Sequence, residues 1–101
     1  MAKTSKLARN AQRKELVARY AERRAALQAI IKNPNTSPDA RAEAYAKLRK
    51  LPRNSAANRI RNRCEVTGRP RAFYRKLKMS RIALRELGNL GQIPGLTKSS
   101  W

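Results

Sequence analysis

The chain has 101 residues, of which 25 are Lys or Arg and 6 are Asp or Glu, giving a formal net charge of +19. A charge this far from zero limits the partners to nucleic acid, an anionic membrane surface or an acidic protein. With no His and a single Cys, the chain lacks the usual general acid–base groups and metal-ligand clusters, so the composition argues against an enzyme.

The apolar content predicts a thin core. Hydrophobic residues make up 41% of the chain, but many are Ala and only 5% of all residues are aromatic. A small chain of this kind needs a partner or regular helix packing for stability. Cys64 cannot form an internal disulfide, which suits a reducing cytoplasmic compartment. The basic N-terminal stretch overlaps in composition with mitochondrial transit peptides, so an organellar location stays open, although we interpret it as part of the mature protein.

A long amphipathic helix is expected over residues 7–31, which are rich in Ala, Leu, Glu, Gln and Arg. Its apolar positions at helical spacing are Leu16, Val17, Tyr20, Ala21, Leu27, Ile30 and Ile31. Asn33-Pro34 should end the helix, because proline disfavours helical geometry in the preceding residue. We interpret Arg19, Arg23 and Arg24 as part of its solvated face.

A second helix is expected from Pro38 to about Lys50. Ser37 offers a hydroxyl to cap free amides, Pro38 fits the first turn, and Asp39 lies near the positive end of the helix dipole. The apolar side would carry Ala42, Tyr45 and Leu48. Two helices with a short link predict an antiparallel pair, so we assign residues 1–52 to a helical arm.

Beyond Pro52 the pattern changes. Residues 53–68 show neither helical nor strand periodicity and are expected to be extended, and residues 72–77 to form a short strand or bend. Ser80 is a candidate N-cap for a helix from Arg81 to about Asn89, with Met79 and Leu84 placed as a hydrophobic staple. Gly88 and Gly91 should end this helix.

Positive charge concentrates between Arg59 and Arg85, where the single acid is Glu65. Such a segment repels itself unless a polyanion neutralises it, and Arg forks with exposed rings suit nucleic acid. Most cations beyond Pro52 are Arg, and most must point outward because acids are so few. The predicted fold is therefore mostly α and stabilised by RNA. It comprises an N-terminal helical hairpin and a module of residues 53–101 with an extended Arg-rich segment, a short strand or bend and a short C-terminal helix.

The ordered motifs RNRC, TGRPR, FYRK, SRI..REL and IPGL..SSW resemble family fourteen of the bacterial small-subunit ribosomal proteins. The front part, with LPRNS at its border, resembles the long form of that family. The resemblance implies a structural constituent of the small subunit that binds the 3′ major domain of its rRNA in the head. It also implies a role in assembly and in the conformation of the aminoacyl-tRNA site, with ribosomal proteins three, ten and nineteen as neighbours.

Some relatives in this family carry a zinc site, written CxxC, twelve residues, then CxxC. In this chain the four positions hold Cys64, Thr67, Ser80 and Ala83. A closed structural zinc site needs four good donors, so we predict no metal here and no other cofactor. Cys64 is expected to be a small buried or half-buried side chain, since no His is present to activate it.

The candidate rRNA-binding residues follow the basic segment. Arg59, Arg61 and Arg63 would alternate along extended chain between rRNA helices, and a turn at Gly68 and Pro70 would direct Arg69 and Arg71 to another backbone. In the expected strand of residues 72–77, successive side chains point to opposite faces, so Phe73 is assigned to the core and Tyr74 to RNA. The complete predicted set is Arg53, Arg59, Arg61, Arg63, Arg69, Arg71, Tyr74, Arg75, Lys76, Arg81, Arg85 and Trp101.

Alternatives remain at this point. Trp101 could fold over the thin core or stack on a base. The whole chain could instead coat an anionic membrane, or bind DNA through residues 81–88. The irregular, Arg-rich second half argues against a membrane partner, and the last helix is short and apolar for reading a DNA groove. No small-molecule substrate is expected.

Overall fold

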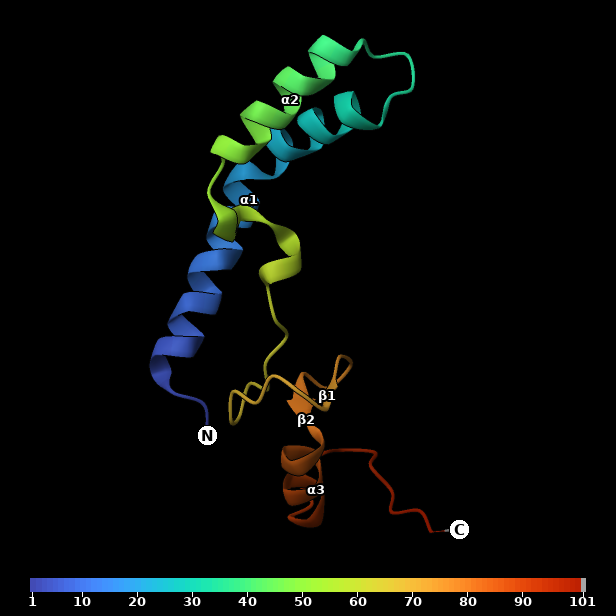
Figure 1. The fold of residues 1–101 in the computed structure, drawn as a ribbon. Coiled ribbons are helices and arrows are strands. Elements are labelled where there is room, and N and C mark those ends of the chain that lie inside the picture. The colour runs from blue at the N-terminus through green and yellow to red at the C-terminus, as the bar shows by residue number, and fades with distance from the viewer. Residues whose placement is uncertain (101) are drawn as a thin grey trace. The chain divides into compact units, whose positions relative to one another are not determined.

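The computed structural model describes residues 1–100, which form two compact units (Figure 1). One unit comprises residues 8–60, and the other combines residues 1–7 with the chain from Arg61 onward. The elements in chain order are α1 (Thr4–Lys32), α2 (Pro38–Lys50), the 3-10 helices η1 (Arg53–Ser55) and η2 (Ala57–Arg59), β1 (Phe73–Tyr74), β2 (Met79–Ser80) and α3 (Arg81–Asn89). The mostly helical fold class is confirmed. The functional boundary expected after residue 52 stays a prediction.

One face of helix α1 is half-buried, and it contains both apolar and polar side chains. Leu16, Tyr20, Leu27 and Ile31 are half-buried, as their spacing predicts, whereas Ala21 and Ile30 are exposed. The same face includes Asn10, Arg13 and Arg24, which the apolar pattern did not reveal. Long cationic side chains can join such a face because their stems are apolar while the charged end reaches a polar partner. Within the described residues, no helix combines the length and apolarity of a membrane span.

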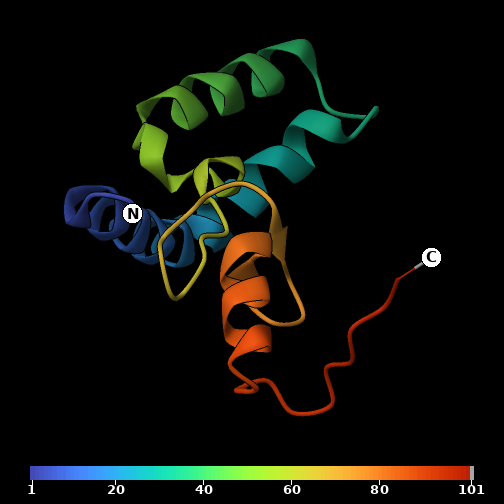
Figure 2. The same cartoon turned by 90° about the horizontal axis from the view of Figure 1, so that it is seen from below.

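Helix α2 begins and ends where the capping residues predict. The Ser37 hydroxyl accepts a hydrogen bond from the Ala40 amide at 3.3 Å, and Pro38 is the first helical residue. The helix then runs back against the direction of α1, which confirms a helical hairpin (Figures 1 and 2). The predicted apolar side is right at Leu48, which is half-buried, but wrong at Ala42 and Tyr45, which are exposed. Ala44 is 3% exposed, while Tyr45 is 44% exposed, because the packed face follows Ala44 and Leu48.

The segment after α2 is held against α1 by Arg24. Its Nε donates to the Ser55 hydroxyl at 2.9 Å, and its Nη2 donates to the Pro52 carbonyl at 3.3 Å. Arg24 is therefore not part of a solvated face. Residues 53–59 are not extended either, because the 3-10 helices η1 and η2 satisfy their backbone groups locally. The chain from residue 60 to residue 64 has no regular secondary structure, as expected.

The second unit is built around a two-stranded hairpin. Strands β1 and β2 are antiparallel, with Phe73 opposite Ser80 and Tyr74 opposite Met79. The sequence predicted a single short strand or bend here, and the returning strand β2 was missed. Two-residue strands are too short to show an alternating pattern. Lys78 closes the turn with a positive φ of 54° and donates its amide to the Tyr74 carbonyl at 2.7 Å.

Residues at the start of the chain pack into this second unit. The Ala2 amide donates to the Thr67 carbonyl at 3.1 Å. Gly68 adopts a φ of +78°, and a Cβ at this position would lie 2.9 Å from the Cβ of Ala2. Glycine is therefore required at residue 68 both for its backbone conformation and for the close approach of the N-terminal segment.

Helix α3 starts and ends at the predicted residues, Arg81 and Asn89. The Ser80 hydroxyl accepts a hydrogen bond from the Ala83 amide at 3.2 Å, which confirms the N-cap. At the other end Gly91, with a φ of +71°, donates to the Gly88 carbonyl, and Gln92 donates to the Leu87 carbonyl. This is a Schellman motif, which ends the helix at its carboxyl side. Gly88 lies inside the helix and does not terminate it.

Candidate nucleic-acid interface

Most of the predicted interface cations are exposed. The exposed members of the set are Arg53, Arg59, Arg61, Arg71, Arg75, Lys76, Arg81 and Arg85. Apart from Arg61, none of these side chains lies within 4.0 Å of a carboxylate in the part of the chain that the structure describes. On α2, by contrast, Lys47 and Glu43 form an ion pair at 2.6 Å. Apart from Arg61, the exposed guanidinium groups of this set are thus available to an external anion.

Two members of the set belong to the helical unit. Arg53 is exposed at the start of η1, and Arg59 ends η2, where its Nη1 lies 3.5 Å from the Asn54 Oδ1. The expected alternation of Arg59, Arg61 and Arg63 along one extended strand is therefore wrong at Arg59. Arg59 lies in η2 and its acceptor Asn54 lies in η1, so these two turns rather than a strand set the direction of its side chain.

Arg61, Arg63 and Arg69 surround the turn that contains Cys64 and Gly68. Arg61 is exposed and its Nε donates to the Pro70 carbonyl at 3.3 Å. Arg63 is half-buried, and its Nη1 donates to the Gly68 carbonyl at 2.9 Å. Arg69 is half-buried as well, and the Nε atoms of Arg63 and Arg69 are buried without an acceptor in the described chain. Arg61 and Arg63 therefore stabilise the backbone of this turn through hydrogen bonds to its carbonyls. Contact of Arg63 and Arg69 with rRNA stays a prediction.

The hairpin places an aromatic ring beside cations. Tyr74 is 50% exposed while its neighbour Phe73 is half-buried, which agrees with the predicted division between the two rings. Arg75, Lys76 and Lys78 are exposed around the turn that follows. Lys78 was not among the predicted residues, although its position in the same basic segment could have included it.

The four positions with zinc-site spacing form a small buried cluster. Cys64, Ser80 and Ala83 are each no more than 3% exposed. Burial raises the pKa of the Cys64 thiol, but hydrogen bonds from the Thr67 hydroxyl and from the amides of Ser80, Thr67 and Val66 together lower the pKa to about 6. A thiol, two hydroxyls and the methyl group of Ala83 do not make a tetrahedral zinc site, so the residues present do not fit that metal.

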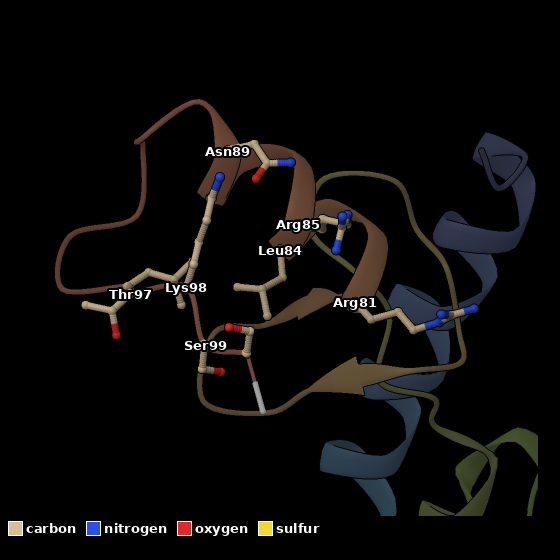
Figure 3. A pocket seen from close by; sticks show the side chains of 10 residues that line it. Arg81, Leu84, Arg85, Asn89, Thr97, Lys98 and Ser99 are labelled. Carbon is tan, nitrogen blue, oxygen red and sulfur yellow. The ribbon is translucent and has the colours of Figure 1, made fainter.

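A groove lies between α3 and the chain that follows it. It has a volume of about 580 Å³, and its lining includes Arg81, Leu84, Arg85, Asn89, Leu96 and Lys98. Arg81 and Arg85 stand on successive turns of α3, and Lys98 extends from the tail toward the end of the helix (Figure 3). Lys98 and Leu96 were missed by the sequence reasoning, although both lie within or beside the IPGL..SSW motif. The predicted contact of Trp101 lies outside the described residues.

Comparison with known proteins places the chain in a family. The sequence model of the family described as ribosomal protein S14p/S29e matches residues 47–100. Relatives named "Small ribosomal subunit protein uS14" are 64% identical in Hyphomonas neptunium, 67% in Caulobacter vibrioides and 61% in Rhizobium meliloti, each over 101 residues and the full length of both chains. The chain therefore belongs to the ribosomal protein S14p/S29e family.

Proposed function

We propose that this protein is a structural constituent of the small ribosomal subunit, incorporated through its rRNA and neighbouring ribosomal proteins. Family membership and the names of the full-length bacterial relatives support this role. The observation that carries the rRNA contact is the set of exposed cations from Arg53 to Arg85 without described carboxylate partners, Arg61 set aside. The role is structural rather than catalytic, and it places the protein in the cytoplasm of a bacterial cell.

The proposed contact is mainly with the phosphate backbone. Arg61 and Arg71 flank the turn that contains Cys64 and Gly68, and Arg81 begins α3, so each can reach a different phosphate. Tyr74 offers a half-exposed ring on which an unpaired base can stack. Because most of the contacts go to phosphates, specificity would come from the shape of the folded RNA.

The resemblance noted in the sequence supplies the finer setting of this proposal. The rRNA partner is the 3′ major domain in the head of the subunit, and the neighbours are ribosomal proteins three, ten and nineteen. Residues 53–101 form the rRNA-binding module, to which Trp101 contributes, and residues 1–52 form an arm for protein neighbours. Through these contacts the protein supports assembly of the head and the conformation of the aminoacyl-tRNA site.

The test is the salt dependence of binding to small-subunit rRNA. Arg61→Gln and Arg71→Gln should each reduce the slope of log affinity against log salt by roughly 0.7 to 0.9, because each removes one phosphate contact. Lys47→Gln is the control, since Glu43 already neutralises that ammonium group. Filter binding over a salt series gives the slopes. Equal slopes for all three variants would contradict the proposal.

Competition separates this function from the two alternatives. Duplex DNA of equal length and anionic liposomes should displace the rRNA only at a large excess over the RNA fragment. Incorporation into reconstituted small subunits, measured by sedimentation, should depend on Arg61 and Arg71 in the same order as rRNA affinity. Tight liposome binding at physiological salt with indifference to rRNA would instead favour a membrane-surface protein.

A further inference from the structure

The groove between α3 and the tail combines an apolar floor with a cationic rim. Leu84 points from α3 toward the tail, and Leu96 contributes from the tail itself (Figure 3). Arg81, Arg85 and Lys98 supply the positive charge around this floor. A volume of about 580 Å³ is within the range of pockets that bind small molecules. Size, floor and rim together are suited to an anionic ligand with a flat apolar part.

The three cations of the groove are not neutralised by the chain. Arg81, Arg85 and Lys98 are exposed, and none has a described carboxylate within 4.0 Å. Glu86 lies on the same helix and borders the surface next to Arg81 and Arg85, but it forms no ion pair with either. Positive groups that line one concavity repel one another, so an anion bound in it relieves part of that repulsion.

Leu96 holds the tail against the helix through Gly88. A Cβ placed on Gly88 would lie 2.6 Å from the Cδ2 of Leu96, so the leucine occupies the space that the missing side chain leaves. The backbone at residue 88 has ordinary helical geometry, which any residue can adopt. The contact with Leu96 is therefore the reason for a glycine at this position. Lys98 follows Leu96 by two residues, and its place on the rim depends on this contact.

On the basis of the proposed rRNA-binding function, we propose that the groove holds an unpaired nucleotide of the rRNA. Its phosphate is bound by Lys98, and its sugar and base lie over Leu84. Arg81 and Arg85 line the helix side of the same groove and add to its positive potential. Asn89 and Thr97 border the same space and provide hydrogen-bonding groups for a base edge. Leu96 is a positioning residue, because it fixes Lys98 without itself contacting the phosphate.

The test is a double-mutant cycle with small-subunit rRNA. Lys98→Gln should weaken binding about five- to tenfold and lower the salt slope by roughly 0.7, since one contact to a single-stranded phosphate is lost. Leu96→Ala should produce the same two changes, although it removes no charge, because the tail carries Lys98 away. The double variant should be no weaker than either single variant. Lys47→Gln and Leu90→Ala are matched controls, the latter at a leucine that is 70% exposed.

The outcomes discriminate between this site and the general function. Wild-type affinity and slope for Leu96→Ala, or fully additive effects in the double variant, would overturn the groove proposal. If Arg61→Gln and Arg71→Gln still weaken binding in that case, the rRNA-binding function stands without the groove. An absence of rRNA binding by the wild-type protein would overturn both. Leu96 is 47% exposed, so its truncation should leave the fold intact, which circular dichroism checks.

Discussion

At the scale of single residues, hydrogen bonds decide the protonation state of the buried Cys64 thiol. The Thr67 hydroxyl and three backbone amides face the sulfur, and together they overcome the effect of burial and lower the pKa of the thiol from 9.0 to about 6. Between about pH 6 and pH 9.0 the folded chain therefore carries a thiolate where the unfolded chain carries a thiol. This contribution to stability is complete above pH 9, and it is lost as the pH falls through about 6.

Removing the Thr67 hydroxyl should raise the pKa of Cys64. In Thr67→Val the thiolate loses its side-chain donor but keeps the backbone amides, so the midpoint should move upward from about 6. Absorbance of the thiolate at about 240 nm during a pH titration measures this midpoint, because thiolates absorb there and thiols do not. Cys64→Ala gives the background. A wild-type midpoint near 9.0 would show that the hydrogen bonds do not stabilise the thiolate.

Gly88 offers a second residue-scale prediction, in which stability and binding change in opposite directions. Alanine favours helix over glycine by about 1 kcal/mol, so Gly88→Ala should stabilise α3 in thermal unfolding. The new Cβ takes the space of Leu96, which lies 2.6 Å from that position, so the tail must shift and rRNA affinity should fall. In a Leu96→Ala background the same substitution should not change affinity. Unchanged affinity in the wild-type background would mean that Leu96 rotates without moving the tail.

At the scale of secondary-structure elements, the N-caps explain why the starts of two helices were predicted to the residue. Ser37 and Ser80 each accept a hydrogen bond from the amide three residues later, and these bonds depend only on neighbouring sequence. The buried face of α2 was predicted less well, because Ala44 and Tyr45 are both compatible with an apolar stripe. Their burial depends on the partner surface, which the local sequence does not contain.

Two hydrogen bonds from Arg24 hold the segment after α2 against α1. Arg24 binds both Ser55 and the Pro52 carbonyl, and Ser55 is 1% exposed. Ser55→Ala removes this acceptor without changing charge, so η1 should open and trypsin should cleave faster after Arg53 and Arg59. Arg23→Ala is the control, because Arg23 lies over the Tyr20 ring at 5.7 Å and takes no part in this contact. Equal cleavage rates for wild type and Ser55→Ala would assign the position of η1 to other contacts.

At the scale of the whole molecule, a thin core coexists with a high positive charge. The fully buried apolar side chains among the described residues are small, namely Ala44, Cys64 and Ala83. Small side chains remove little apolar area from water, and a net charge of +19 opposes compaction. Both features favour a partner that supplies negative charge. Stabilisation of the second unit by RNA follows as a prediction from the same balance.

The sequence by itself indicated an anionic partner, the family and the bounds of α2 and α3. Net charge does not depend on the fold, the family is recognised from the order of its motifs, and helix caps depend on neighbouring residues. Each of these can therefore be read from the sequence. The tertiary structure alone decided which cations are free. Arg24 meets a residue 31 positions away, Arg63 turns onto its own backbone, and Lys98 joins Arg81 and Arg85 only because the tail folds along α3. These arrangements depend on contacts between distant segments, for which local periodicity and composition contain no signal.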